Sequence, residues 1–241
     1  MSKVEQHYDA LLALHYSWLM GGFEECVARS EALLKRLDIR PMLSGKALDL
    51  GCGPGFQSIA LAKAGFKVTA LDQCFKMVAE LKKNVAGLEV TPVQDDMENF
   101  AYHSPGQVDV VLCMGDTIAH LENRDAVVAF VEKLAGGLEP DGRLVLTFRD
   151  QSRELHGTDR FLQLRADDGR IFSVFLEYAA EHIDVTDLLH IRMRDGWKLF
   201  KSAYRKTRLT AESMKETCTW VGLTIDLLEV EQGLVTLVAR K

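Results

Sequence analysis

Short apolar runs alternate with amphipathic stretches through the first half of the chain. Residues 47–50, 67–71 and 89–93 are rich in apolar or β-branched side chains, which predicts buried strands. Residues 59–64 predict a helix, and Pro54 stands near its start, where a missing N–H costs little. Strand, glycine turn, helix and strand in this order predict a βαβ unit with parallel strands.

The same alternation continues toward the C-terminus. The segment VDVVLCMGDTIAHL, from residue 108, predicts a fourth strand that ends near residues 113–115. An amphipathic helix follows, because Val127, Phe130, Val131, Leu134 and Leu138 recur at helical spacing. Asp141-Gly142 marks a turn before a fifth strand. A helix over 211–221 and a hairpin of strands 223–230 and 234–239 close the chain.

Two further regions flank this alternation. Residues 3–37 predict two helices broken at Gly21-Gly22. Residues 160–209 predict four antiparallel strands, with hairpin turns at Asp168-Gly169 and Asp195-Gly196. The strands are expected over 161–166, 171–178, 183–194 and 197–209.

Composition and charge narrow the class of protein. The chain has 241 residues, is 47% hydrophobic and 27% charged, and is therefore expected to be globular. A net charge of −6 disfavours nucleic acid and anionic membrane as partners. Five scattered cysteines without a CxxC pair argue against structural zinc and disulfides and suit the cytoplasm. The N-terminus has no signal-peptide layout, and no apolar run is long enough to span a bilayer.

The stretch KALDLGCGPGFQSIALAKAGFKVTALD, residues 46–72, carries the candidate chemistry. Its glycines at 51, 53 and 55 allow a sharp turn and a close approach of ligand to backbone. Asp72 ends the second strand at the edge where open α/β sheets bind ligands, and its carboxylate can accept two hydrogen bonds from a ribose diol. The dinucleotide pattern G-x-G-x-x-G fails at Phe56, whereas D-x-G-x-G-x-G fits from Asp49. A nucleoside site is favoured over an ordinary strand-to-helix connection.

With these motifs the chain resembles the class I S-adenosylmethionine (SAM)-dependent methyltransferases from about Lys46 to its end. The resemblance implies a Rossmann-like α/β fold with a mostly parallel seven-stranded sheet, helices on both faces and an antiparallel last strand. It further implies one domain, with an N-terminal helical lid (1–40), a core (41–155 and 210–241) and an antiparallel β insertion (156–209).

The resemblance assigns cofactor contacts by motif. It places Asp96 at the adenine amino group, the backbone N–H of Met97 at the ring, and Met114 and Gly115 at the methionine part, while Asp95 is expected to be solvated. The full set of cofactor residues is Asp49, Gly51, Cys52, Gly53, Gly55, Asp72, Gln73, Asp96, Met97, Met114 and Gly115. The cofactor is then SAM and its product S-adenosylhomocysteine, with no metal.

Methyl transfer from a sulfonium needs alignment and exclusion of water more than acid–base chemistry. Asp116 and His120 follow the fourth strand and are expected beside the transferred methyl. His120 is either a base, since its ordinary pKa is near neutrality, or a histidine bonded to backbone. The segment GDTIAHL is similar to that of glycine-type N-methyltransferases, which favours a small amine acceptor. Tyr8 is expected at the substrate, whereas Trp18 is expected only to pack its helix.

The predicted insertion is rich in basic residues, with only Asp195 as an acidic neighbour. One interpretation is the solvated face of a half-buried sheet. The other is recognition of a substrate carboxylate or phosphate by Arg192 and Arg194. The basic residues are Arg192, Arg194, Lys198, Lys201, Arg205, Lys206 and Arg208.

The leading hypothesis is a SAM-dependent methyltransferase acting on a small molecule, with an amine among the candidate acceptors. A second is an RNA or protein methyltransferase, although the net charge opposes RNA, and Met114-Gly115-Asp116-Thr117 replaces the Asn/Asp-Pro-Pro-aromatic tetrad of base-amino methylation. A third is a catalytically silent SAM-binding protein. The pattern assigns neither the methylated atom nor the oligomeric state.

Overall fold

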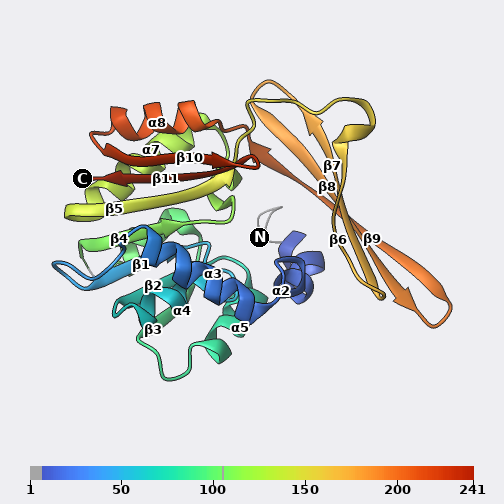
Figure 1. The fold of residues 1–241 in the computed structure, drawn as a ribbon, viewed down its shortest axis with the longest axis horizontal. Coiled ribbons are helices and arrows are strands. Elements are labelled where there is room, and N and C mark those ends of the chain that lie inside the picture. Colours follow the sequence, from blue (N-terminus) through green and yellow to red (C-terminus); the bar gives the residue numbers. More distant parts are fainter. Residues whose placement is uncertain (1–6, 105) are drawn as a thin grey trace.

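The computed structural model describes residues 7–104 and 106–241. Its core is a seven-stranded sheet of order β10-β11-β5-β4-β1-β2-β3 (Figure 1). Strands β1 to β5 are parallel to their neighbours in that group, and β11 lies antiparallel between β5 and β10. The predicted Rossmann-like sheet and its antiparallel last strand are confirmed. Its strands are β1 (Lys46–Leu50), β2 (Lys67–Asp72), β3 (Val90–Gln94), β4 (Val108–Cys113), β5 (Leu138–Arg149), β10 (Thr224–Glu231) and β11 (Leu234–Arg240).

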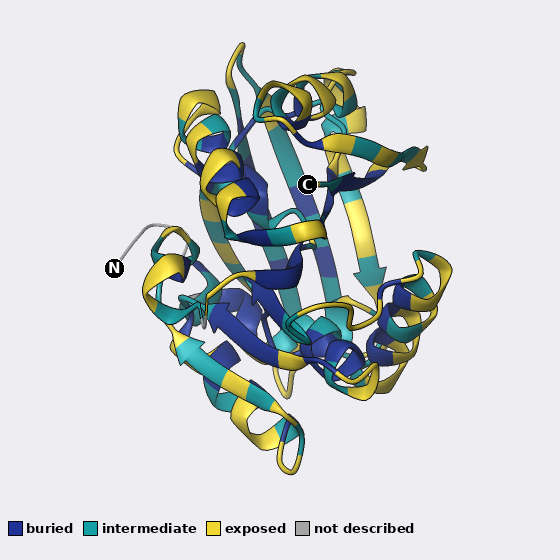
Figure 2. Ribbon diagram, turned by 90° about the vertical axis from the view of Figure 1, so that its left-hand side faces the viewer, coloured by how far each residue is buried: buried dark blue, intermediate teal, exposed yellow. Residues whose placement is uncertain are grey.

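Helices cover both faces of this sheet, and its central strands are therefore continuous apolar runs in the sequence. One apolar cluster joins the sheet to α3 (Phe23–Arg36), α4 (Phe56–Lys63) and α5 (Phe75–Asn84). The other joins it to α7 (Arg124–Gly137) and α8 (Ala211–Trp220). Every residue of β4 is buried, and Figure 2 shows exposed residues on the outward sides of the helices.

The helices differ from the sequence prediction in detail. Helix α4 begins at Phe56, three residues earlier than predicted, because Gly55 takes a left-handed conformation and caps it. Helix α5 was not predicted. Leu138 does not extend α7 but opens β5, and the predicted turn at Asp141 appears as a positive φ of 61° within that strand.

A second, four-stranded antiparallel sheet follows β5 and stands apart from the core in Figure 1. Its strands are β6 (Phe161–Ala166), β7 (Arg170–Tyr178), β8 (His182–Met193) and β9 (Gly196–Thr207), preceded by the short helix η5 (Gly157–Arg160). All four predicted strands and both predicted turns are confirmed within a few residues.

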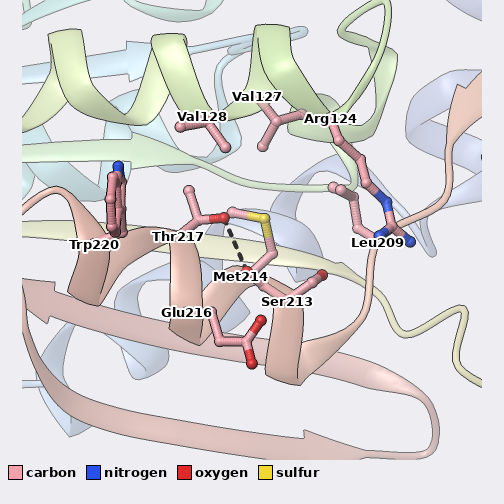
Figure 3. A pocket seen from close by; sticks show the side chains of 9 residues that line it. All are labelled: Arg124, Val127, Val128, Leu209, Ser213, Met214, Glu216, Thr217 and Trp220. Atoms are coloured by element: carbon pink, nitrogen blue, oxygen red, sulfur yellow. Dashed lines mark hydrogen bonds between the residues drawn. The ribbon is translucent and has the colours of Figure 1, made fainter.

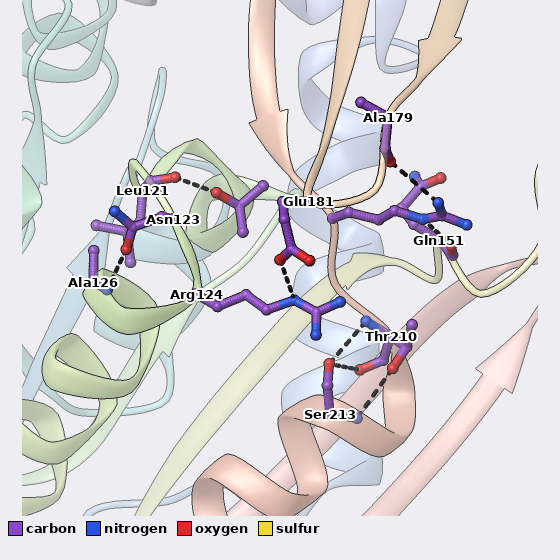
Figure 4. A network of polar contacts seen from close by, with 11 residues as sticks. Leu121, Asn123, Arg124, Ala126, Gln151, Ala179, Glu181, Thr210 and Ser213 are labelled. Atoms are coloured by element: carbon purple, nitrogen blue, oxygen red, sulfur yellow. Dashed lines mark hydrogen bonds and ion pairs between the residues drawn. The ribbon is translucent and has the colours of Figure 1, made fainter.

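Polar contacts fasten the base of this second sheet to the core (Figure 4). The Thr207 hydroxyl donates to the Leu121 carbonyl at 2.6 Å, and Arg124 pairs with Glu181 at 3.4 Å. Arg208 donates to the carbonyls of Gln151 and Ala179. The residues of the insertion that make these contacts belong to the β7–β8 turn and to the end of β9, so its orientation on the core is fixed at the base.

The N-terminal segment lies between the two sheets (Figure 1). Its predicted first helix is broken into a π-helical turn η1 (Tyr8–Leu12), a 3-10 turn η2 (Ala13–His15) and α2 (Tyr16–Leu19). Leu11 and Leu12 pack on the four-stranded sheet, whereas Ala13 packs on Met77 of α5. Contacts on two sides account for the irregular winding. The break at Gly21-Gly22 is confirmed, since both have positive φ, and the predicted start of the helix before residue 7 lies outside the described residues.

Candidate active site

The glycine loop folds back on β2 directly after β1. The backbone N–H groups of Gly51 and Cys52 both donate to the Leu71 carbonyl, at 2.8 and 3.0 Å. Gly53 then donates its N–H to Asp72 Oδ2, and Cys74 donates its own to Asp72 Oδ1, each at 2.8 Å. The Asp72 carboxylate is therefore held in one orientation by backbone before any ligand arrives.

The space around this loop admits no side chain at Gly51. A Cβ there would lie 2.3 Å from Thr117 Cγ2, and Gly51 has a φ of +69°. At Gly53, φ is +54° and a Cβ would meet the ring of Tyr16 at 3.7 Å. Gly55 serves packing instead, because a Cβ there would lie 2.4 Å from Leu81 Cδ1 on α5.

A cavity of about 260 Å³ opens at the carboxyl ends of β1 to β4. Its lining includes predicted residues from five separate segments, namely Tyr8, Gly51, Gly53, Asp72, Gln73, Asp96, Met97 and His120. Tyr16, Cys74, Met77, Glu98, Thr117, Leu121 and Glu122 complete the lining. Asp72, Asp96, Glu98 and Glu122 give this lining an acidic character, and no Lys or Arg of the described chain is part of it.

Other residues predicted for the cofactor lie behind the loop. Asp49 is 1% exposed and accepts a 2.5 Å hydrogen bond from the Ser58 hydroxyl, while Cys52 is buried beside it. Met114 packs against the apolar cluster under α3 and α4. Gly115 lies near Tyr16, which lines the cavity, since a Cβ at Gly115 would be 3.7 Å from the Tyr16 hydroxyl. These residues, with Gly55, shape the loop from beneath and do not line the cavity.

Burial shifts the two carboxyl groups of the loop in the same direction. It raises the pKa of Asp72 from 3.8 to about 6, against the lowering effect of its bonds from Cys74 and Gly53. It raises the pKa of Asp49 to about 7, against the lowering effect of the Ser58 hydroxyl. Asp95, by contrast, is not simply solvated as expected. It accepts hydrogen bonds from Asn99 and His103, which hold its pKa below the usual value.

His120 ends the 3-10 turn η4 (Thr117–His120) and lies among aromatic rings. Its ring centroid is 5.9 Å from that of Tyr8 and 5.5 Å from that of Tyr204 on β9. Burial, together with the charge of Lys206, lowers the pKa of His120 to about 3, so the imidazole is neutral. Its Nδ1 is buried without a hydrogen-bond partner among the described residues. His120 is thus placed to accept a hydrogen bond, not to carry charge.

The Asp116 carboxylate forms its bonds at the junction between the core and the second sheet. Its carboxylate pairs with the Lys206 ammonium from β9 and accepts the backbone N–H of Arg149 at 3.0 Å. It does not line the cavity. The pairing nevertheless brings Lys206 close to His120, a proximity that nothing in the local sequence indicated.

A second buried pair ties the N-terminal segment to β8. His7 Nε2 lies 2.9 Å from Asp187 Oδ2, and the two side chains are 0% and 1% exposed. The Tyr204 ring packs on His7 with centroids 4.3 Å apart. His7 Nδ1 and Asp187 Oδ1 have no partner among the described residues. Sequence reasoning missed this pair, because its members stand 180 positions apart.

The structure does not bring the predicted substrate arginines to the cavity. Arg192 and Arg194 lie at the β8–β9 hairpin tip and are exposed. Three other basic residues of the insertion have acidic partners that the sequence did not indicate, so the expectation of an almost unpaired basic set is wrong. Arg205 pairs with Asp184, Lys206 with Asp116 and Arg208 with Glu154. Trp18 packs the N-terminal segment on the second sheet, as expected, since Arg170 of β7 stacks over its ring at 4.3 Å.

A larger hollow of about 400 Å³ lies between α7 and α8 (Figure 3). It shares no residue with the cavity described above and contains none of the residues that the motifs single out. Val127, Met214 and the exposed ring of Trp220 make it largely apolar. The chemistry therefore centres on the smaller cavity at the strand ends.

Comparison with known proteins bears on this geometry. Residues 47–142 match a family model described as a methyltransferase domain. The matched residues include the strands β1 to β4 and the glycine loop, and thus the segments that form most of the cavity.

Curated relatives match the domain over part of their length. A ubiquinone biosynthesis O-methyltransferase from Proteus mirabilis is 33% identical over 111 residues, which are 45% of this chain and 44% of that protein. One from Salmonella paratyphi A is 37% identical over 101 residues, 41% of this chain and 40% of that protein. The chain thus matches less than half the length of these relatives.

Solved structures share the whole architecture. A SAM-dependent methyltransferase from Clostridium acetobutylicum superposes with a TM-score of 0.73 at 15% identity, over 99% of this chain and 97% of that one. A SAM-bound amino pentose methyltransferase from Micromonospora echinaspora gives 0.72 at 20% identity, over 93% and 94%. The sugar N-methyltransferase of a Streptoalloteichus species gives 0.70 at 19%, over 95% and 92%. The core and the β insertion therefore share the fold of these methyltransferase structures.

The cavity fits the cofactor that this family uses. Backbone without side chains lines it at Gly51 and Gly53, and an added Cβ at Gly51 would clash with Thr117. A preoriented carboxylate, Asp72, is available for ribose hydroxyls, and Asp96 and Met97 also line the cavity. Among the described residues no group of three His, Cys, Asp or Glu side chains is placed to hold a metal ion, and no helix is long and apolar enough to cross a membrane.

Proposed function

We propose that this protein transfers a methyl group from SAM to a small-molecule acceptor and releases S-adenosylhomocysteine. The observation that carries the proposal is the cavity at the carboxyl ends of β1 to β4, with Asp72 held by the glycine loop and His120 in the same lining. In this assignment Asp72 binds the ribose hydroxyls, Asp96 and Met97 the adenine, and the backbone of Gly51 and Gly53 allows close approach. Tyr8 and Tyr16 cover the cavity from the N-terminal segment.

The bound cofactor would supply a methyl group on a positively charged sulfur. The chain's own task is then to hold the acceptor in line and to keep water out. The ring of Tyr8 lines the cavity next to His120, Tyr204 packs on His120, and the neutral His120 can accept a hydrogen bond from an acceptor N–H or O–H. Lys206 is neutralised by Asp116, so the wall next to His120 carries no free cation.

An amine is the acceptor that the lining favours. Four carboxylates face the cavity and no described Lys or Arg does, which attracts an amine and repels a carboxylate or phosphate. An amine that arrives as a cation must first lose its proton to solvent, since only the neutral nitrogen has the lone pair that forms the bond to the methyl group. The exposed position of Arg192 and Arg194 supports the same choice, since the basic groups that would recognise an anion lie at the hairpin tip.

Label transfer tests this function. Purified protein would be offered methyl-labelled SAM and a cell extract divided into small-metabolite, RNA and protein fractions, with Asp72→Ala as the control in which transfer is reduced. Label in the small-metabolite fraction is expected, and mass spectrometry of the product would identify a methylated amine. Label in RNA or protein would refute the small-molecule acceptor, and SAM binding without label in any fraction would favour a silent SAM-binding protein.

A further inference from the structure

One face of the four-stranded sheet packs on the N-terminal segment, and the other is open. Along β8, alternate residues from Ile183 to Leu189 are buried, and Ile183, Val185 and Leu189 belong to the cluster with Leu11 and Leu12. The residues between them point the opposite way, as the period of a strand requires. We name the second set, together with its cross-strand neighbours, the outer face.

The outer face is rich in apolar side chains that join no packed cluster of the described chain. Leu199 is 47% exposed, Trp197 49% and Phe161 57%. Phe161 stacks on Phe175 with ring centroids 4.4 Å apart. The registers of the sheet assign to this face Phe161, Ile171, Phe175, Leu188, Trp197, Leu199 and Ala203.

The charges of the outer face are segregated along the strands. Glu177 and Asp184 lie in one cross-strand row near the base of the sheet, where Asp184 pairs with Arg205. Arg192 lies at the opposite end, eight residues further along β8. Leu188, opposite Lys201 on β9, stands midway between these ends.

We propose that the outer face is the interface of a homodimer, in which two copies pack sheet to sheet about a two-fold axis that crosses the strands at Leu188. This arrangement places Arg192 over Asp184 of the second copy, Leu188 over itself and Leu199 over Ala203. It also places Arg205 over the indole of Trp197, a favourable cation–π geometry. The face is self-complementary in charge and in apolar surface, as an isologous contact requires.

The size of the face agrees with such a contact. Strands about 4.8 Å apart with a rise of about 3.3 Å per residue give four strands of this length an area of roughly 600 Å² on each copy. The total of roughly 1,200 Å² is at the lower limit of stable specific interfaces. Lys201 meets its own copy near the axis, but β9 is an edge strand, so the long side chain can turn its ammonium to solvent.

Sedimentation of the full chain tests the interface. We expect a species of twice the 27.0 kDa chain mass, and Leu188→Glu should shift it to the monomer by raising the dissociation constant at least 10-fold. Trp220→Glu, at an exposed apolar residue on α8 outside the outer face, is the control and should leave the dimer intact. Circular dichroism would verify that each variant is folded. A monomeric parent chain, or a dimer lost with Trp220→Glu and not with Leu188→Glu, would overturn the proposal.

A charge exchange tests the orientation of the two copies. Arg192→Asp and Asp184→Arg should each weaken the dimer, and the double variant should recover most of the loss. The two positions are about 26 Å apart along one strand, so the rescue can arise only between copies. A double variant no tighter than either single one would contradict the two-fold arrangement. Lys201→Met should tighten the dimer, since it removes a like-charge contact near the axis.

Discussion

Replacing Asp72 by alanine should weaken SAM binding by about 1–3 kcal/mol, because a carboxylate held by the N–H groups of Gly53 and Cys74 would no longer meet the ribose. Isothermal titration would measure the change. Asp95→Asn is the matched control, since Asp95 ends the neighbouring strand but does not line the cavity. Equal losses in the two variants would remove Asp72 from the site.

The pH dependence of binding follows from the same carboxyl group. Its pKa is raised from 3.8 to about 6 by burial, so affinity for SAM should fall as pH drops through about 6 and the carboxylate protonates. The contribution of Asp72 to the stability of the fold changes with pH in the opposite direction, because a raised pKa means that folding favours the protonated carboxyl group. Asp72 therefore stabilises the fold below about pH 4, and this contribution is lost as pH rises through about 6. Titrations at several pH values, with the fold followed by circular dichroism, would separate binding from unfolding.

His120 should act as a neutral hydrogen-bond acceptor. His120→Ala should lower kcat/KM for the acceptor about 5- to 30-fold, the equivalent of about 1–2 kcal/mol for one lost hydrogen bond. Because the pKa of His120 is lowered to about 3, the wild-type profile should show no histidine ionisation near pH 6.5 that His120→Ala abolishes. His103→Ala, outside the cavity, is the control. Loss of such an ionisation in the variant would show that His120 titrates as a base.

At the level of elements, the glycine loop depends on close packing with η4. Gly51→Ala would place a methyl group 2.3 Å from Thr117 Cγ2, and Thr117 cannot rotate away without breaking its 2.8 Å hydrogen bond to the Met114 carbonyl. We expect SAM affinity to fall more than 10-fold and the urea midpoint to decrease. Gly87→Ala has a similar φ, +83°, with open space around it, so it should cost only about 1–2 kcal/mol of backbone strain and leave affinity unchanged. Equal effects on affinity would show that the contact with Thr117 is irrelevant.

At the scale of the whole molecule, the His7–Asp187 pair should couple the N-terminal segment to the second sheet. His7→Ala would leave the Asp187 carboxylate buried without its partner and should lower the free energy of unfolding by about 3–5 kcal/mol. The double variant His7→Ala with Asp187→Ala should cost less than the sum of the single ones, which a double-mutant cycle in urea would measure. Glu181→Ala, which breaks the exposed Arg124–Glu181 pair, should cost about 0–1 kcal/mol. Strict additivity at His7 and Asp187 would show that they are not coupled.

The part of the cavity that we assign to the cofactor could largely be predicted from local sequence. The apolar runs set strands that are buried on both faces, and Gly51, Gly53 and Asp72 stand at the strand ends where the parallel order places them together. The same local signals did not distinguish residues that line the cavity from residues that support the glycine loop from beneath. Asp49 and Cys52 carry the motif yet lie beneath the loop, because a strand alternates its side chains and the turn that follows buries them.

The acceptor half could not be predicted in this way. His120 was singled out, but its neighbours Tyr204 and Lys206 come from β9, about 85 residues further along the chain. The basic character of the insertion also proved misleading, since the partners of Arg205, Lys206 and Arg208 are supplied by β8, by the core and by the segment after β5. Charge counted along a strand omits partners that only neighbouring elements provide.

The sequence by itself determined most of the elements, the parallel core and the position of the glycine loop, because hydrophobic period and glycine placement act over a few residues. Tertiary structure alone decided which titratable groups meet, from His7 with Asp187 to Asp116 with Lys206, and which face of the second sheet stays open. Those contacts depend on how the insertion sits on the core through its base. The orientation arises from packing and hydrogen bonds between distant segments, which local periodicity does not predict.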